Sequence, residues 1–220
     1  MGERYEQRAF VVPPDATEIV LVRHGASQDA VPGEPFELLE GHADPALSPV
    51  GEQQAQKVAE RLADEPLQAI YTSRLTRTVQ TAGPLAERLG LQPTALPELN
   101  EVKLGDWEGG EFRIRGYRGD PLFFRVLEEE RWDVIPNGES NEALGERVRT
   151  GIERMVAEAG TGVSVAAFVH GGVIGELCRQ ATESRPFAFV HADNCSVSRL
   201  IVLGNGRWLL RSFNDTSHLA

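Results

Sequence analysis

An apolar run that stops abruptly at Arg23-His24-Gly25 constrains this fold more than any other feature of the chain. Residues 17–23 read Thr-Glu-Ile-Val-Leu-Val-Arg, which predicts a buried strand. In open α/β sheets, ligands bind beyond the carboxyl ends of the strands. Arg23 brings a permanent charge and a fork of donors suited to phosphate oxygens, and a neutral His24 can act as a nucleophile. Gly25 lets the backbone turn sharply and approach a ligand closely.

A second apolar strand, predicted over 162–169, also ends in histidine and glycine, here His170-Gly171-Gly172. A lone histidine after a strand is more often structural, but two with the same local pattern are harder to dismiss. Parallel strands end on the same side of a sheet. If these two strands are neighbours, His24 and His170 face one another across a site.

Strands alternate with helices along the chain, which predicts an α/β fold: a three-layer sandwich with a mostly parallel central sheet, helices on both faces and an antiparallel edge. Ser48-Pro49 opens a helix as cap and first residue, and Gly90 ends the next helix, inside which Pro84 predicts a kink or a break. The further expected segments are a strand at 67–72, helices at 75–89, 144–159 and after 172, and a hairpin about 204–206.

The length suits one domain, 1–220, with a lid-like excursion at about 106–138 inside an irregular stretch over 91–138. We expect residues 26–47 to form a long loop. The net charge of −11 argues against nucleic acid as a partner, and no apolar window is long enough to cross a membrane. The only cysteines, Cys178 and Cys195, favour a reducing compartment, so we expect a cytoplasmic protein.

Two sets of charged residues are candidates for further roles. Arg74 and Arg77 follow the strand at 67–72 and fall in the predicted first turn of a helix, where free N–H groups favour an anion. The residues that compete for the role of general acid are carboxylates in the segment 98–109: Glu98, Glu101, Asp106 and Glu108. Spacing alone does not choose within either set.

Taken together, the motifs resemble the histidine phosphatase superfamily, which contains the cofactor-dependent phosphoglycerate mutases and many phosphomonoesterases. The resemblance extends from residue 19 to residue 218. The matching segments are Arg23-His24-Gly25, Leu47-Ser48-Pro49-x-Gly51-x-Gln53-x-Ala55, Ser73-x-Leu75-x-Arg77-Thr78-x-x-Thr81-Ala82, Leu99-x-Glu101-x-x-x-Gly105-x-Trp107-Glu108-Gly109, Pro136-x-Gly138-Glu139-Ser140 and His170-Gly171-Gly172. No single motif carries the assignment.

The resemblance implies a phosphoglycerate mutase-like fold. It also implies catalytic roles for five residues: Arg23, His24, Arg77, Glu101 and His170. His24 would attack phosphorus and form a phosphohistidine, while its other ring nitrogen donates to a carbonyl. Arg23, Arg77 and His170 would surround the phosphoryl oxygens. Glu101 would protonate the leaving group and then activate water, which leaves Arg74 variable and Glu108 structural. Further phosphate-binding donors would come from Ser27, Gly171 and Gly172. No metal or cofactor is implied.

The resemblance further implies a metal-independent phosphomonoesterase of the histidine acid phosphatase type that acts on a small phosphorylated metabolite. Gly172 and an excursion of modest length favour hydrolysis over mutase-type phosphoryl transfer. A non-catalytic binder of phosphorylated ligands is a third reading, supported only by Ala30, which stands where the family often has a phosphate-contacting asparagine. Asn194 is a candidate replacement donor. The sequence does not identify the substrate, and a homodimer is left open.

The remaining charged and aromatic candidates have open roles. Arginines of the excursion could bind a second anionic group or form a solvated patch: Arg113, Arg115 and Arg118. Aromatic residues could line a leaving-group pocket or close the core: Trp107, Trp132, Phe123 and Phe124. We assign no catalytic role to His42, His191 or His218.

Overall fold

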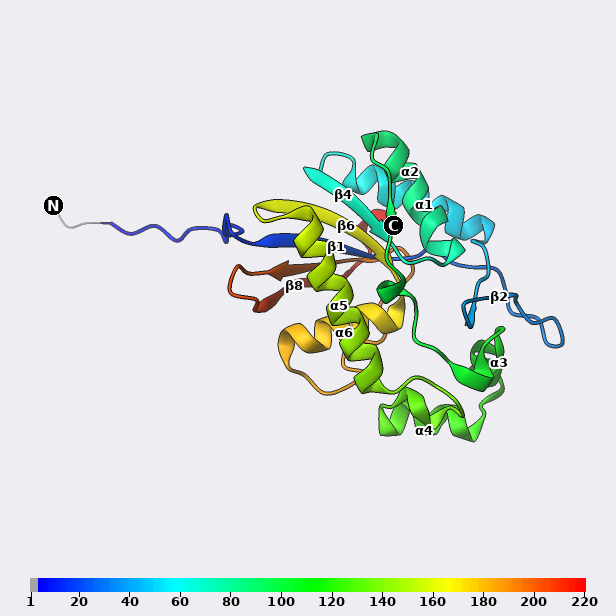
Figure 1. The fold of residues 1–220 in the computed structure, drawn as a ribbon. Coiled ribbons are helices and arrows are strands. Elements are labelled where there is room, and N and C mark those ends of the chain that lie inside the picture. Colours follow the sequence, from blue (N-terminus) through cyan, green and yellow to red (C-terminus); the bar gives the residue numbers. More distant parts are fainter. Residues whose placement is uncertain (1–3) are drawn as a thin grey trace.

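A six-stranded sheet organises the computed structural model, which describes residues 4–220. The strand order is β5-β4-β6-β1-β7-β8, in which β5, β4, β6 and β1 run parallel and β7 and β8 add the antiparallel edge (Figure 1). The strands are β1 (Thr17–Arg23), β4 (Leu67–Thr72), β5 (Thr94–Ala95), β6 (Val163–Val169), β7 (Val197–Val202) and β8 (Trp208–Asp215). The predicted α/β architecture is therefore confirmed.

The alternation of side chains along β1 divides the core between the two faces of the sheet. Val20 and Val22 pack in one apolar cluster with α1 (Pro49–Leu62) and α2 (Thr76–Leu89). Ile19 and Leu21 belong to a second cluster with α5 (Asn141–Ala159) and α6 (Gly171–Thr182). Figure 1 shows the two helix pairs on opposite sides of the sheet.

The capping residues of the first two helices act as the sequence indicated. The Ser48 side chain caps α1 by accepting from the N–H of Gly51 at 3.2 Å, and Pro49 occupies the first turn. Gly90 ends α2 in the left-handed conformation, with φ of 65°. The expected break at Pro84 does not occur, because α2 runs through this residue.

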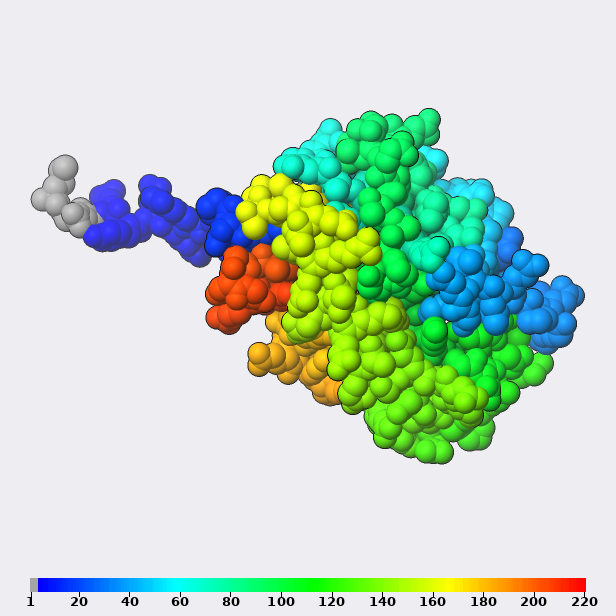
Figure 2. All heavy atoms as spheres, in the orientation of Figure 1, coloured from blue at the N-terminus to red at the C-terminus, as the bar shows by residue number. Residues whose placement is uncertain are grey.

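Two segments contain more regular structure than expected. The stretch 91–138 holds α3 (Glu111–Arg118) and α4 (Pro121–Glu129), together with short 3-10 helices at Pro97–Leu99, Gly105–Trp107 and Trp132–Val134. The loop 26–47 contains a small hairpin of β2 (Leu38–Leu39) and β3 (His42–Ala43). In Figure 2 the region of this hairpin lies against the excursion at the end of the molecule opposite the amino-terminal arm.

Every parallel strand delivers its carboxyl end to the same edge of the sheet, and the chain there carries the residues singled out above. The neighbours β1 and β6 pair in register, with Arg23 opposite Val169, so their following histidines emerge together. Within residues 4–220, no helix combines the length and apolar character needed to cross a membrane.

Candidate active site

His24 and His170 meet at the carboxyl ends of adjacent strands. The backbone N–H of His24 donates to Val169 O at 2.9 Å, which continues the β1–β6 pairing past the last strand residue. The two imidazole rings lie edge to face with centroids 5.2 Å apart. Both residues are buried, so the folded chain holds two imidazoles in one largely desolvated place.

The hydrogen bonds of His24 leave one ring nitrogen available. Nδ1 lies 2.7 Å from the carbonyl oxygen of Gly25, and because a carbonyl only accepts, Nδ1 carries the proton. Nε2 then has the free lone pair. Burial, followed by the charges of Arg77 and Arg23, holds the pKa of His24 well below its ordinary value. The imidazole is therefore neutral at pH 7, the form in which nitrogen is nucleophilic.

Gly25 serves a different purpose from the expected turn. Its φ is not positive, and a Cβ added there would lie 2.6 Å from the backbone oxygen of Gly51 in the first turn of α1. A Cβ on Gly51 would in turn meet Ala26 O at 2.0 Å. The two glycines thus allow backbone-to-backbone contact between the His24 segment and α1. The N–H of Gly25 also donates to Thr81 Oγ1 at 3.0 Å.

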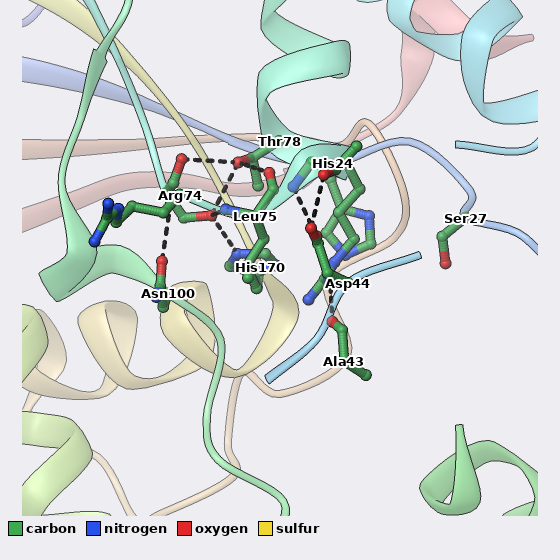
Figure 3. A network of polar contacts seen from close by, with 12 residues as sticks. His24, Ser27, Ala43, Asp44, Arg74, Leu75, Thr78, Asn100 and His170 are labelled. Carbon is green, nitrogen blue, oxygen red and sulfur yellow. Dashed lines mark hydrogen bonds and ion pairs between the residues drawn. The ribbon is translucent and has the colours of Figure 1, made fainter. Parts of the chain in front are cut away.

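A chain of hydroxyl groups sets the orientation of His170. Its Nε2 lies 2.8 Å from Ser73 Oγ, which lies 2.9 Å from Thr78 Oγ1, and Thr78 donates to Leu75 O at 2.8 Å (Figure 3). The Thr78 hydroxyl donates its only proton to Leu75 O, so it accepts a hydrogen bond from the Ser73 hydroxyl. The Ser73 hydroxyl in turn accepts from His170 Nε2–H. Nδ1 of His170 is left buried without a partner, beside the site. Burial and the charge of Arg77 hold the pKa of His170 well below the usual range.

Half-buried Arg23 and buried Arg77 place two guanidinium groups at the site. Arg23 Nη1 donates to Ala192 O at 2.5 Å, and its Nε has no partner. Arg77 Nη1 donates to Ala43 O at 2.8 Å, and burial lowers its pKa to about 10, so it stays protonated at pH 7. Arg74 instead precedes α2, is exposed and pairs with Glu40.

Glu101 and Glu108 both line the cavity above the histidines, but their contacts differ. Glu108 is bound on both oxygens, accepting from Leu104 N at 2.8 Å and Ala43 N at 2.6 Å, which suits a structural tie. Both oxygens of Glu101 accept as well, from Val102 N at 3.0 Å and from Gly172 N at 3.3 Å, but these bonds are longer. Glu101 is therefore the carboxylate with less fixed hydrogen bonds.

The predicted phosphate-binding donors are not all free. The Gly172 amide points at Glu101, and a Cβ on Gly172 would lie 2.6 Å from Glu101 Oε1, so this glycine makes room for the carboxylate. Gly171 lies against Arg23, whose Nε would be 3.5 Å from an added Cβ. Ser27 is buried and accepts from Arg113 of α3. Asn194 donates to His24 O at 2.9 Å, so its amide positions the histidine backbone.

Two adjoining cavities open beside His24, with volumes of about 210 and 600 Å³. Arg23, His24 and Arg113 line both. The smaller continues past Glu101 between aromatic and aliphatic side chains, including Trp107, Trp132, Phe36, Phe112 and Val102. Of the tryptophans and phenylalanines in question, Trp107 and Trp132 thus reach the cavity wall, whereas Phe124 is exposed. Within residues 4–220, no group of three or more His, Cys, Asp or Glu side chains is arranged to hold a metal ion.

His42 is the residue of this site that the sequence did not reveal. It belongs to β3, lines the smaller cavity and is only 5% exposed, and neither ring nitrogen has a hydrogen-bond partner of normal geometry. Burial lowers its pKa, so it is neutral at pH 7. A histidine in a polar, irregular segment carries no pattern that announces burial. His191 is exposed, and His218 Nε2 contacts Cys195 O at 3.0 Å.

Comparison with known protein families identifies the family to which the chain belongs. A family model described as histidine phosphatase superfamily (branch 1) matches residues 19–216. The chain belongs to this superfamily. A relative named phosphoglycerate mutase-like protein 4, from Arabidopsis thaliana, is 33% identical over 211 residues, covering 93% of this chain and 88% of the relative.

Other members of the superfamily with similar sequences or structures are named as phosphatases. The metal-independent phosphoserine phosphatase of Arabidopsis thaliana is 30% identical over 214 residues, covering 95% of this chain and 86% of its own. A mycobacterial glucosyl-3-phosphoglycerate phosphatase superposes with a TM-score of 0.73 at 28% identity, covering 91% of this chain and 100% of that structure. The superfamily and these relatives make the chain a phosphatase-type enzyme with a phosphoglycerate mutase-like fold.

The lowered pKa values of the paired histidines predict that stability falls in mild acid. Unfolded histidines bind a proton near pH 6.5, whereas folded His24 and His170 do not. Between pH 6.5 and the lower folded pKa values, the unfolded chain binds more protons, so the free energy of unfolding decreases as pH falls, by up to about 1.4 kcal/mol per pH unit for each group. Urea midpoints in phosphate-free buffer at pH 7.5, 6.5 and 5.5 measure this.

The control for this prediction is His170→Asn, which removes one of the two groups. Its urea midpoint should vary less between pH 6.5 and 5.5 than that of the unaltered protein. An equal or larger variation in the variant would contradict the assignment of the buried neutral state to His170.

Proposed function

We propose that this protein hydrolyses phosphomonoesters of small metabolites without a metal ion, through a phosphohistidine on His24. The observation that carries the proposal is the state of His24: Nδ1 is committed to Gly25 O and Nε2 is free. The positive charges of Arg77 and Arg23 act on this imidazole. In this proposal the whole chain is one catalytic domain, of the histidine acid phosphatase type, and the excursion at 106–138 is its lid.

In the first chemical step, His24 Nε2 attacks phosphorus in line with the ester oxygen. The N–P bond forms as the P–O bond breaks, and the electron pair of that bond leaves with the oxygen. Arg23 and Arg77 stabilise the charge on the non-bridging oxygens, so positioning and electrostatics supply most of the rate. Glu101 supplies the proton that the leaving oxygen takes up.

In the second step, water attacks the phosphohistidine. The Glu101 carboxylate, left deprotonated by the first step, accepts a proton from the attacking water, and the N–P bond breaks with its electron pair returning to Nε2. Inorganic phosphate leaves and the neutral imidazole is restored. The unpartnered Nδ1 of His170 is a site at which a proton can accompany the bound phosphate dianion.

The family resemblance favours hydrolysis over mutase-type transfer, because the mutases tend to have asparagine where this chain has Gly172 and a longer lid that is rich in basic residues. Gly172 is the second residue after His170, and its amide and open Cα hold Glu101 close to the phosphoryl site. The leaving-group cavity combines apolar side chains with charged ones, among them Arg77, Glu108 and Arg113. A small phosphorylated substrate and a cytoplasmic location complete the proposal.

The test is phosphate release from a panel of phosphomonoesters that includes phosphoserine and 3-phosphoglycerate, with excess EDTA present. We expect EDTA-resistant release from at least one member, accompanied by an acid-labile, base-stable phosphoenzyme. Release that disappears with EDTA would contradict metal independence. No release from any member would overturn hydrolysis, and the same protein would then be assayed for mutase activity with a bisphosphate primer.

A further inference from the structure

Among the described residues of the excursion, Arg113 is the arginine that lines both cavities beside His24. It projects from α3, and its Nη2 donates to Ser27 Oγ at 2.5 Å while Nη1 donates to Gln28 O at 2.8 Å. These partners belong to the loop that directly follows the nucleophile. Its guanidinium therefore joins the excursion to the His24 loop at the mouth of the site.

The other two arginines of α3 are placed differently. Arg115 forms ion pairs with Glu111 and Asp120 and lies over the Trp107 ring at 5.1 Å, so its charge and face are occupied by the excursion itself. Arg118 is exposed and reaches only the larger cavity. The sequence grouped the three together, but their contacts assign them separate roles.

Arg113 acts electrostatically on the same imidazole as Arg23 and Arg77. Burial is the main cause that lowers the pKa of His24, Arg77 and Arg113. Beyond burial, the charge of Arg113 further lowers the pKa of His24 and of Arg77, and the charge of Arg23 further lowers the pKa of Arg113. Positive charges that repel one another are stabilised when an anion binds between them. A phosphoryl group held at His24 is such an anion.

The guanidinium of Arg113 has donors left for a ligand. It carries five N–H groups, of which one goes to Ser27 and one to Gln28. The residue is exposed to the solvent of the cleft, so its remaining donors are accessible without displacing other protein groups. Arginine donors bind phosphate oxygens through short, charge-assisted hydrogen bonds.

Two small residues allow α3 to approach the loop so closely. A Cβ added at Gly110, just before α3, would lie 2.9 Å from the Cβ of Ala30. A longer side chain at position 30 would meet this backbone and hold α3 away. The alanine that offers no donor of its own thus makes room for the helix that carries Arg113.

We propose that Arg113 binds the transferred phosphoryl group directly, as a third arginine beside Arg23 and Arg77, and supplies from the excursion the donor that Ala30 lacks. This inference rests on the proposed function for its substrate but concerns phosphate binding, which can be measured without turnover. It also distinguishes the phosphoryl group itself from a second anionic group on the substrate as the ligand of Arg113.

The experiment measures binding of inorganic phosphate by calorimetry, and kcat/KM with p-nitrophenyl phosphate and phosphoserine, for Arg113→Ala and Arg113→Lys. We expect Arg113→Ala to weaken phosphate binding by about tenfold to a hundredfold, the usual effect of a charged hydrogen bond. The kcat/KM of both substrates should fall by similar factors, and Arg113→Lys should recover part of the loss. Thermal melting verifies that each variant is folded, and the conservative variant keeps the test decisive if the alanine variant is not.

The matched control is Arg125→Ala, since Arg125 is an exposed arginine of α4 that pairs with Glu129 away from the cleft. It should change neither phosphate affinity nor kcat/KM. Unchanged phosphate affinity in Arg113→Ala would overturn the proposal, as would a loss confined to phosphoserine. If the unaltered protein binds phosphate through Arg113 but hydrolyses no ester, the inference stands and the proposed function fails; if it neither binds nor hydrolyses, both fail.

Discussion

His24→Asn is expected to abolish hydrolysis of every phosphomonoester that the protein accepts, lowering kcat by at least about 10⁴-fold, the scale on which enzymes lose activity with their nucleophile. The asparagine Nδ2–H can keep the bond that His24 Nδ1–H donates to Gly25 O. What the variant lacks is Nε2, the atom that would bond to phosphorus. The change therefore removes the nucleophile while preserving the local hydrogen bonding.

Three measurements separate loss of the nucleophile from loss of the fold. Calorimetry should show that the variant still binds inorganic phosphate, since the flanking arginines remain. Acid-quenched mixtures with radiolabelled substrate should contain no phosphoenzyme. His191→Asn, an exposed histidine outside the cleft, should behave as the unaltered protein. Residual turnover in His24→Asn above about 1% of normal would contradict a covalent role for His24.

Glu101→Gln is expected to produce an effect that depends on the leaving group. An alkoxide needs a proton to leave, so its release should slow by about 10²- to 10⁴-fold, the usual contribution of general acid catalysis. p-Nitrophenolate leaves without a proton, so phosphorylation of His24 by p-nitrophenyl phosphate should remain fast. Hydrolysis of the phosphohistidine should be slow with both substrates, because the amide cannot take a proton from water.

Rapid-mixing experiments display this difference. With p-nitrophenyl phosphate, Glu101→Gln should give a burst of p-nitrophenol that matches the enzyme concentration, followed by a slow phase, whereas phosphoserine should give no burst. Glu108→Gln is the matched control: its carboxylate holds the Leu104 and Ala43 amides, so the change should lower the melting temperature without a leaving-group pattern. The burst appearing in Glu108→Gln and not in Glu101→Gln would reverse the two roles.

The framework of the fold was predictable because its signals are local. The apolar run of β1 ends at Arg23-His24-Gly25. Ser48-Pro49 indicates the start of α1, and in the structure the Ser48 side chain caps this helix. The helices of the excursion were harder to predict from the sequence. Asp120-Pro121 is a good start signal and does cap α4, but α3 next to it begins and ends at glycines and is too polar to show a clear apolar stripe.

The residues of the candidate site also divide into those that local sequence predicts and those that it does not. Arg23, His24 and His170 follow from strand ends, which parallel pairing brings together. The burial of His42 depends on a hairpin of two-residue strands, and the reach of Arg113 depends on the close contact of Ala30 with Gly110. Both are tertiary effects between segments that have no periodicity of their own. Spacing in the sequence does not encode them, and only the arrangement in space reveals them.

The close backbone contact between Gly25 and Gly51 fixes the position of His24 independently of the residues that line the cavity wall. The nitrogen that we propose as the nucleophile is positioned by main-chain contacts, from the two glycines to the bond between His24 N and Val169 O, and these contacts do not involve the leaving group. The cavity wall that would meet the leaving group comes from other segments, which include the β2–β3 hairpin, residues 101–104 and the excursion. Mutations that accumulate in that wall can therefore change which ester is accepted without moving the reactive atom, so new specificities can evolve while the chemistry stays the same.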